Sequence, residues 1–233
     1  MIISHKHRFI FIKTMKTAGT SIEVFLSDHC GPRDVLTPIH PSEPGHLPRN
    51  HRGVFDPRPA LRLAGRAGMP SRRRTLGHVL RRVRFYNHMP ALLVRSRVPR
   101  DVWEGYFKFC VEREPFSKTV SLYRMNRAAG GARTLDEFLA QPRLLSDWHR
   151  YADDGGRPIV DRILRYEALD AELAEVFARL GIPFPGKLQP KAKAAPSAPG
   201  AAAEDAETFS PAQRRKIRAR FANEFAQLYP SSP

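Results

Sequence analysis

One short stretch near the start of the chain combines a positive charge, three hydroxyl groups and two small residues. It reads Lys16-Thr17-Ala18-Gly19-Thr20-Ser21. An ammonium group and hydroxyl groups donate hydrogen bonds to an anion. Small residues such as Ala18 and Gly19 allow main-chain N–H groups to approach that anion closely. This combination of residues indicates a phosphate-binding loop.

The segments on either side of this stretch predict a strand before it and a helix after it. Phe9–Ile12 is rich in aromatic and β-branched residues, which is typical of a buried strand. Residues 22–26 have an apolar face that predicts a helix. A helix that begins at such a loop directs unpaired N–H groups and the positive end of its dipole toward an anion. An ordinary strand–turn–helix with a solvated lysine is the alternative interpretation.

The order of the residues differs from that of the nucleotide-triphosphatase loop. In that loop a lysine follows the last glycine. Here Lys16 precedes Gly19. The stretch therefore predicts phosphate binding of another kind.

A second strand–turn–helix pattern surrounds Arg113. Residues 106–111 predict a buried strand, and residues 116–126 predict a helix that Pro115 can begin, because the first turn of a helix needs no N–H from that residue. A guanidinium group is a fork of donors that suits a phosphate dianion, and the hydroxyl of Ser121 follows two helical turns later. On its own, Arg113 could equally form a surface ion pair.

These two stretches resemble the cofactor-binding motifs of sulfotransferases that use 3′-phosphoadenosine 5′-phosphosulfate (PAPS), closest to the carbohydrate-type branch. Residues 13–23 are similar to the 5′-phosphosulfate loop, with Met15 where that loop often has Pro. Residues 106–123 are similar to the 3′-phosphate motif, with Glu114 where Asn is usual. We expect the Glu114 carboxylate to point away from the phosphate or to pair with an arginine. The resemblance extends over about residues 8–182.

The resemblance implies a cofactor, a fold and a set of site residues. PAPS would be the cosubstrate, no metal would be required, and the fold would be P-loop-like, a three-layer αβα arrangement. Strands that alternate with helices along the chain also predict an α/β protein with a mostly parallel central sheet. The residues implied in cofactor binding are Lys16, Thr17, Ala18, Gly19, Thr20, Ser21, Arg113 and Ser121.

Sulfuryl transfer requires stabilisation of the leaving group and a base for the acceptor. Lys16 is placed to stabilise the leaving phosphate as the S–O bond breaks. A hydroxyl acceptor needs a base of near-neutral pKa, and we expect His88 to supply it. Glu112 and Glu23 are alternative bases, although we expect Glu23 to support the first loop. His88 could instead be a structural histidine.

Composition predicts one domain, residues 1–233, without a disulfide scaffold. The chain has 233 residues, is 42% hydrophobic and contains two cysteines that lie far apart in sequence. We find no N-terminal apolar stretch of signal-peptide length, and Phe9–Ile12 is too short to span a membrane. We therefore expect a cytoplasmic protein. Residues 187–208 are low in complexity and predict a linker before a C-terminal helix at 210–228.

Positive charge is concentrated between Arg49 and Arg100. This stretch contains fourteen Arg and one acidic residue, Asp56, in a chain of net charge +16. Such a field attracts polyanions, including an acidic glycan acceptor or a nucleic acid. Residues 40–77 are rich in Pro, Gly, Arg and His and predict a long basic loop that is mobile or becomes ordered with substrate. A solvated, arginine-rich loop without a ligand is the alternative.

We therefore expect a sulfotransferase that moves a sulfuryl group from PAPS to a hydroxyl acceptor, which we expect to be a carbohydrate. Three alternatives remain open: a nucleic-acid-binding protein, a nucleotide kinase with an unusual phosphate loop, and a sulfotransferase relative that has lost activity. Few aromatic residues occur in the basic stretch, so platforms for stacking bases are sparse. Within the motifs we find no carboxylate after a strand in the position that a kinase needs for a metal ion.

Overall fold

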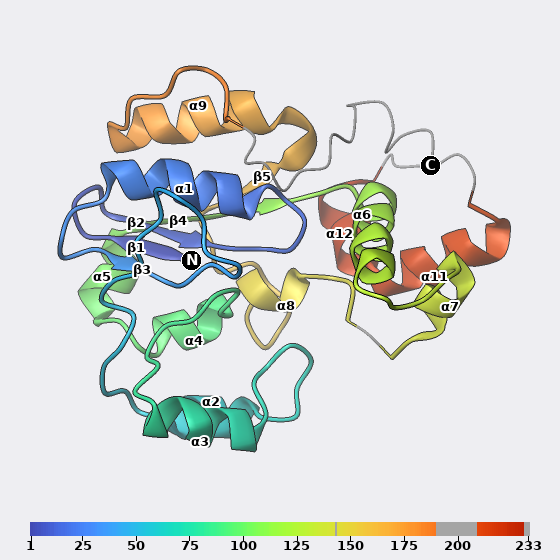
Figure 1. Ribbon diagram of the computed structural model, residues 1–233, viewed down its shortest axis with the longest axis horizontal. Coiled ribbons are helices and arrows are strands. Elements are labelled where there is room, and N and C mark those ends of the chain that lie inside the picture. Colours follow the sequence, from blue (N-terminus) through green and yellow to red (C-terminus); the bar gives the residue numbers. More distant parts are fainter. Residues whose placement is uncertain (143, 190–208, 231–233) are drawn as a thin grey trace. The chain divides into compact units, whose positions relative to one another are not determined.

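The computed structural model describes residues 1–142, 144–189 and 209–230, and the chain divides into two compact units (Figure 1). Unit 1 consists of Met1–Glu112 and His149–Gln189, and unit 2 of Arg113–Trp148 and Pro190–Pro233. The expected single domain stays a prediction. Residues 190–208 of the expected linker lie outside the described residues.

Unit 1 contains a five-stranded sheet in the order β3-β1-β2-β4-β5. The strands are β1 (Ile2–Ser4), β2 (Phe9–Ile12), β3 (Val35–Leu36), β4 (Phe107–Glu112) and β5 (Arg162–Arg165). Strands β2, β4 and β5 are parallel, whereas β1 is antiparallel to both of its neighbours. The α/β class is confirmed, with a mixed sheet.

The prediction of a mostly parallel sheet holds for its centre, and β1 is the strand that departs from it, because it runs antiparallel to β2 and to β3. Only residues 5–8 separate β1 from β2. A connection this short can join only antiparallel strands, because a parallel pair needs a long crossover. The predicted phosphate loop follows β2, which is one of the adjacent parallel strands β2, β4 and β5.

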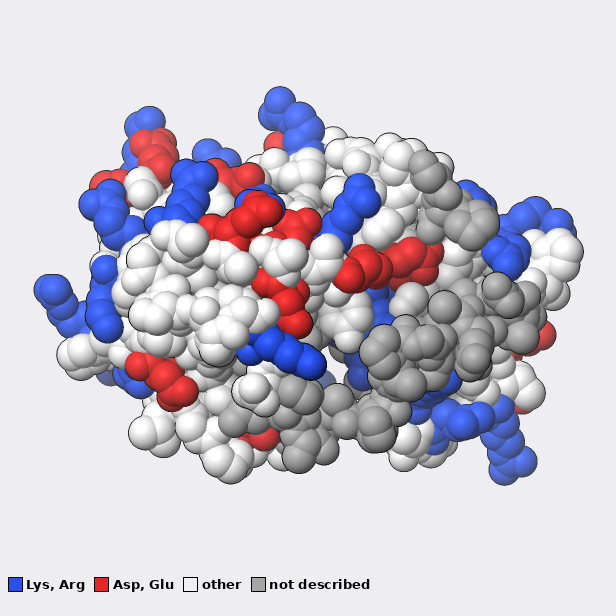
Figure 2. Space-filling view, turned by 90° about the horizontal axis from the view of Figure 1, so that it is seen from above, with Lys and Arg blue, Asp and Glu red and all other residues white. Residues whose placement is uncertain are grey.

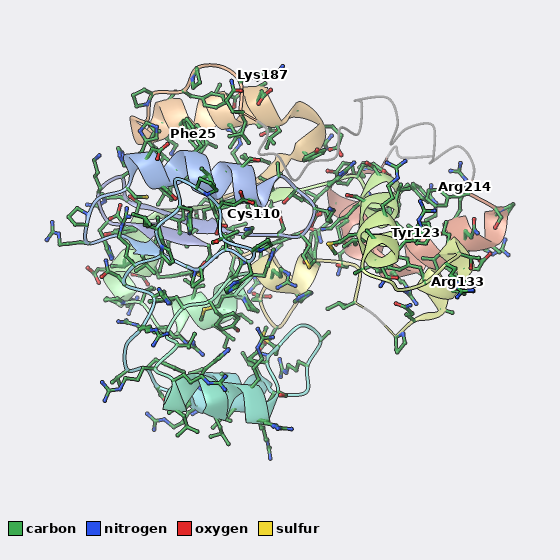
Figure 3. The ribbon with its side chains drawn as sticks, viewed as in Figure 1. Phe25, Cys110, Tyr123, Arg133, Lys187 and Arg214 are labelled. Carbon is green, nitrogen blue, oxygen red and sulfur yellow. The ribbon has the colours of Figure 1, made fainter. Side chains whose placement is uncertain are left out.

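One face of the sheet is covered by two helices of unit 1 (Figure 1). They are α1 (Gly19–His29) and α9 (Leu169–Leu180), and α9 follows the short 3₁₀ helix η1 (Tyr166–Ala168). Alternate strand residues point to the same side, so Phe9, Phe11 and Phe109 meet in the core under these helices. Phe25 extends from α1 toward α9 (Figure 3), where its ring stacks on that of Phe177 at 5.1 Å between centroids. On the side of α1 and α9 that faces away from the sheet, acidic and basic side chains are interspersed (Figure 2).

The helices α4 (Ala91–Arg95) and α5 (Arg100–Gly105) lie on the other side of the sheet (Figure 1). Lys108 points to this side, and its Nζ donates to the carbonyl oxygen of Trp103 in α5 at 3.0 Å. The helix α8 (Trp148–Tyr151) also contributes here, because the Tyr151 hydroxyl donates to Glu112 of β4 at 3.0 Å. Beyond α4 in Figure 1 lie α2 (Arg58–Leu63) and α3 (Arg72–Leu80).

The expectation of a continuous loop at 40–77 is wrong where α2 and most of α3 lie. Pro57 is the N-cap of α2 and Pro59 stands in its first turn, where a missing N–H is tolerated. Ser71 caps α3 by accepting a hydrogen bond from the Arg74 N–H at 3.2 Å. Pro57 and Pro59 thus mark the start of a helix, whereas Pro41, Pro44 and Pro48 lie in the non-helical part of the stretch.

Unit 2 is helical in its described residues. Its helices are α6 (Pro115–Ala128), α7 (Leu135–Ala140), α11 (Pro211–Arg220) and α12 (Ala222–Gln227). The Phe116 ring lies 5.5 Å from Phe209 and 5.4 Å from Phe225 between centroids. Thr134 and Glu137 form a capping box at the start of α7.

The prediction of one helix over 210–228 is wrong at Phe221. This residue has φ −118° and ψ 31°, and its side chain is fully buried. It leaves the helical conformation, so that α11 and α12 are separate helices. In none of the described segments do we find a helix with the length and hydropathy needed to cross a membrane.

Candidate functional site

The predicted phosphate loop is a turn between β2 and α1 with an unusual backbone. Lys16 has φ 61° and Ala18 has φ 56°, both in the left-handed region that residues other than glycine seldom adopt. Successive right- and left-handed residues turn their N–H groups into one concavity, which binds anions. Strained residues of this kind concentrate at functional sites. Lys16 is half-buried in the turn.

The start of α1 lacks a side-chain cap. Ala18 is the N-cap residue, and no side chain bonds to the N–H groups of the first turn as a cap. The first helical bond runs from the Ile22 N–H to the Ala18 carbonyl oxygen at 3.1 Å. The N–H groups before Ile22 have no carbonyl within the helix to bond, and the helix dipole adds a partial positive charge. Gly19, Thr20 and Ser21 supply these groups.

The hydroxyl of Thr17 has a role that we did not predict. Thr17 is fully buried, and its Oγ1 lies 2.8 Å from Oγ1 of Thr14. The Thr14 hydroxyl in turn donates to the carbonyl oxygen of Val111 in β4. These bonds hold the loop to the sheet, so Thr17 can offer a ligand its main-chain N–H but not its hydroxyl. The hydroxyl groups of Thr20 and Ser21 belong to half-buried residues at the helix start.

Lys13 is a residue of this site that we did not predict. Its Nζ lies 2.5 Å from Glu23 Oε2 and 3.3 Å from Thr20 Oγ1. Glu23 also bonds the α-amino group of Met1, and its side chain is fully buried. The only signal in the sequence is the position of Lys13 directly after an apolar strand.

The surroundings of Glu23 make it a support of the loop. Burial opposes ionisation of this carboxyl, but the ammonium groups of Met1 and Lys13 outweigh burial and hold its pKa below the ordinary value. A carboxylate with a lowered pKa is a weak base. The expectation that Glu23 supports the first loop therefore fits better than the alternative of a catalytic base.

Gly19 is required by a close approach of Lys13. A Cβ atom added to Gly19 would lie 2.8 Å from Cγ of Lys13 and 3.0 Å from its Cε. We predicted a small residue here for access of an anion. The structure adds a second reason, because the aliphatic part of Lys13 lies across this position.

His88 lies at the base of the same loop. Its Nδ1 is 3.2 Å from the carbonyl oxygen of Lys13, and Arg150 donates to the carbonyl oxygen of His88. A ring nitrogen that faces a carbonyl oxygen carries the hydrogen, so Nε2 is the basic nitrogen of the neutral ring. The predicted base and the predicted phosphate loop thus meet in unit 1. The φ of His88, 57°, is again left-handed.

Glu112, the other alternative base, is inside unit 1. Its side chain is fully buried and accepts a hydrogen bond from the Tyr151 hydroxyl at 3.0 Å. This burial favours a structural role for Glu112.

Cavities beside His88 and α3 are bounded by arginines. One, of about 190 Å³, is lined by His88, Arg74 and Arg150. Another, of about 410 Å³, is lined by residues of α3 and its ends, including Arg74 and His78. Burial first, and then the charges of nearby arginines, lowers the pKa of His78 to about 4. Burial likewise lowers the pKa of Arg97 to about 10.

In unit 2, Arg113 is held by a residue that we did not predict. Arg113 is buried, and its Nε donates to Oγ of Ser117 at 2.8 Å. Arg113 directly precedes the N-cap Glu114, and Ser117 lies in the first turn of α6, so the signal that could have identified Ser117 is its place at the helix start next to Arg113. Ser121 is half-buried and lies four residues further along the same side of α6.

Glu114 is the N-cap of α6. Its carboxylate accepts a hydrogen bond from the Ser117 N–H at 2.7 Å. A carboxylate at this position also favours the helix dipole. The departure from Asn in the motif is therefore explained by capping.

Residues 1–142, 144–189 and 209–230 contain no group of three His, Cys, Asp or Glu residues arranged to hold a metal ion. No family model matches the sequence. Over 101 residues the chain is 33% identical to a protein of Archaeoglobus fulgidus with the name "Uncharacterized protein". The match covers 41% of this chain and 84% of the archaeal protein.

Proposed function

The chain belongs to the same family as the archaeal protein, whose name states no activity, so we propose a function from its own residues. The protein is a sulfotransferase that moves the sulfuryl group of PAPS to a hydroxyl group of a carbohydrate. The observation that carries this proposal is the uncapped start of α1 after a loop with left-handed Lys16 and Ala18. Such a start binds a phosphate through main-chain N–H groups.

The proposal includes a P-loop-like, three-layer αβα arrangement for the part of the chain that holds this loop. It is supported by the parallel strands β2, β4 and β5 and by helices on both sides of the sheet (Figure 1). In a parallel sheet the carboxyl ends of the strands share one edge, where ligands bind. The loop begins at that edge, after Ile12.

The proposed reaction needs in-line attack and charge stabilisation. The acceptor oxygen forms a bond to sulfur, the bond from sulfur to the 5′-phosphate oxygen breaks, and adenosine 3′,5′-bisphosphate leaves with the electron pair. Lys16 and the N–H groups from Thr17 to Ser21 stabilise the charge on that oxygen. His88 takes the acceptor proton at Nε2.

Arg113 is the proposed ligand of the 3′-phosphate. Its Nε is oriented by Ser117, which pre-organises the guanidinium fork for an anion. Ser121 adds a hydroxyl donor in the proposal. Recognition of a 3′-phosphate would separate PAPS from ATP, which lacks that group.

Aromatic rings of the basic stretch are stacked by arginines, which weakens the nucleic-acid alternative. The guanidinium carbon of Arg97 lies 3.7 Å from the centroid of the Phe55 ring, and that of Arg74 lies 5.3 Å from the Tyr86 ring. A ring covered by a guanidinium offers less surface to a base. Nucleic-acid binding that falls steeply with salt and survives Lys16→Ala would favour that alternative.

The test is calorimetric titration with adenosine 3′,5′-bisphosphate and, separately, with ATP. The proteins are the native chain, Lys16→Ala, Arg113→Ala and the control Arg133→Ala, which removes an exposed arginine of unit 2. We expect the bisphosphate to bind in preference to ATP. We expect Arg113→Ala to weaken it roughly 10- to 100-fold, the effect of losing a hydrogen bond to a charged group, and Arg133→Ala to leave it unchanged. Absence of binding, or a preference for ATP, would reject an active sulfotransferase.

A further inference from the structure

The reaction described above assigns no group of PAPS or of the acceptor to the cavity of about 190 Å³ beside His88. It is lined by residues from separate parts of unit 1, among them Gly68, Arg74 of α3, Tyr86, His88 and Arg150 of α8. Pockets for whole small molecules usually measure about 300–1,000 Å³. This cavity therefore suits one group of a larger ligand.

The charges around this cavity favour an anion. Two of its lining residues are arginines, Arg74 and Arg150, and in the described part of the chain neither Asp nor Glu lines it. A third arginine, Arg97, has its guanidinium carbon 6.0 Å from the centroid of the Tyr86 ring and is only 4% exposed. Guanidinium groups in a cavity whose lining contains no carboxylate attract phosphate, sulfate or carboxylate groups and can bind them with two parallel hydrogen bonds.

Two polar atoms of the lining residues add a further requirement. The Tyr86 hydroxyl and Asn87 Oδ1 are buried, and neither has a hydrogen-bond partner among the described residues. Buried polar atoms normally have a partner, so these two indicate a ligand. The tyrosine hydroxyl can donate to an anion, whereas the asparagine oxygen can accept only from a donor such as a hydroxyl group. A ligand that satisfies both atoms carries an anionic group and a hydroxyl group.

The position of His88 connects this cavity to the chemistry. His88 lines the cavity, and its Nδ1 lies 3.2 Å from the carbonyl oxygen of Lys13, three residues before Lys16 of the phosphate loop. The chain around Gly68, which also lines the cavity, packs closely on His149, because a Cβ on Gly68 would lie 1.8 Å from the His149 ring. The ion pair of Arg66 with Asp154, at 2.7 Å, also joins that segment to the chain beyond α8.

We propose that this cavity is the anion subsite of the acceptor: Arg74 and Arg150 bind its phosphate, sulfate or carboxylate group, and the hydroxyl to be sulfated lies at His88. This inference rests on the proposed function, since it names the class of acceptor. The acceptor is an acidic or already esterified sugar, and the subsite selects it over a neutral sugar. Arg74 and Arg150 are then specificity-determining residues.

The test is titration of the full chain with four simple sugars, in the presence and in the absence of adenosine 3′,5′-bisphosphate. The probes are glucose 6-phosphate, glucose 6-sulfate, glucuronate and uncharged glucose. We expect at least one charged sugar to bind at least tenfold more tightly than glucose, and the comparison of the three identifies the anion. We expect Arg74→Gln to weaken that binding roughly tenfold or more, because a charge-assisted hydrogen bond is lost.

The matched control is Arg72→Gln, which removes the same charge from an exposed position of α3 outside this cavity. Arg150→Gln serves as a second variant, and Arg74→Gln stands alone if Arg150→Gln disturbs His88. Equal loss in Arg72→Gln, equal binding of glucose, or no binding of any charged sugar would overturn the proposal. Titration without the bisphosphate keeps this result separate from the test of cofactor binding, since the cavity can be occupied in either case.

Discussion

The helices that follow the parallel strands β2 and β4 begin in opposite ways. At the start of α1 no side chain caps Ala18, and the preceding turn contains left-handed Lys16. At the start of α6 the carboxylate of Glu114 accepts the Ser117 N–H at 2.7 Å. The two connections have similar patterns of residues in the sequence. Only the connection before α6 places a negatively charged side chain, that of Glu114, at the start of its helix.

This difference assigns different means of binding to the two starts. An uncapped start can bind an anion through main-chain N–H groups. A start that already holds a carboxylate must use side chains, here Arg113 and Ser121. We therefore expect α1 to be sensitive to changes in its supports and α6 to changes in the side chains that orient Arg113.

The largest expected effect is on the support of α1. In Glu23→Gln the buried ammonium group of Lys13 loses its carboxylate, which costs about 3–5 kcal/mol of stability by analogy with broken buried pairs. Because the pKa of Glu23 is lowered, the pair stabilises the protein above the ordinary carboxyl pKa of 4.5 and this contribution is lost as the pH falls. Urea unfolding at several pH values measures both effects.

The control for this variant is Glu175→Gln, which breaks an ion pair of Arg162 whose glutamate is 67% exposed. Such surface pairs contribute about 0–1 kcal/mol. If the two variants lost the same stability, Glu23 would not be the support of the open helix start.

The next effect concerns the contact of Gly19 with Lys13. An alanine normally stabilises a helix relative to glycine by roughly 0.5–1 kcal/mol. In Gly19→Ala the new Cβ would lie 2.8 Å from Lys13 Cγ, and we expect overpacking to cost about 1–3 kcal/mol and to outweigh that gain. Thermal unfolding decides the sign.

Gly77→Ala is the matched control for Gly19→Ala. Gly77 lies within α3, and an added Cβ there meets nothing within 4 Å. We expect this variant to be more stable than the native chain. A gain in both variants would show that Lys13 moves aside without loss.

We expect a smaller effect at α6, on the affinity for adenosine 3′,5′-bisphosphate. In Ser117→Ala the Nε of Arg113 loses its oxygen partner. We expect adenosine 3′,5′-bisphosphate to bind about fivefold more weakly, which corresponds to one hydrogen bond of about 1 kcal/mol. Calorimetry on Ser117→Ala, Arg113→Ala and the double variant should give a double-variant loss no larger than that of Arg113→Ala. If the losses of binding free energy in the two single variants added up in the double variant, Ser117 would act independently of Arg113.

We expect the smallest effect from a substitution that removes the negative charge at the start of α6, so that this start resembles that of α1. Glu114→Asn removes the negative charge but keeps a residue that caps helices well. We expect the affinity for the bisphosphate to rise about two- to fivefold, the size of a charge effect at a helix end. Glu137→Gln makes the same charge change at α7, and there we expect no change in affinity. A fall in affinity for Glu114→Asn would mean that the carboxylate supports the site.

Local patterns were enough to predict the elements that hold the candidate site. The strand at Phe9–Ile12, the strand predicted at 106–111 and found at Phe107–Glu112, and the helix that begins at Pro115 are confirmed. The end of α9 at Gly181 and the capping box of Thr134 are local patterns of the same kind. Each depends on residues close together in sequence, such as apolar runs, caps and a left-handed glycine. Residues 2–4 of β1 are too few to show a period, and the strand is defined by its pairing with β2 and β3.

Side-chain partners in the site were harder to predict for a similar reason. The position of the phosphate loop follows from a strand, a turn and a helix. The bond of Lys13 to Glu23 depends on where a helix lies over a strand end, and the contact of His88 with Lys13 joins residues 75 positions apart. Thr17 illustrates the limit, since its residue type predicted a ligand hydroxyl and its burial directs that hydroxyl to Thr14.

The edges of the sheet in unit 1 have a consequence for self-association. An exposed strand edge offers unpaired N–H and C=O groups to another chain, and long flat edges promote aggregation. The edge strand β3 has only two residues, and Leu36 exchanges two main-chain hydrogen bonds with Arg49 at 3.0 Å. The opposite edge strand, β5, begins and ends with arginine. A short, partly covered edge and a charged edge both discourage strand addition, so this sheet is protected against edge-to-edge polymerisation.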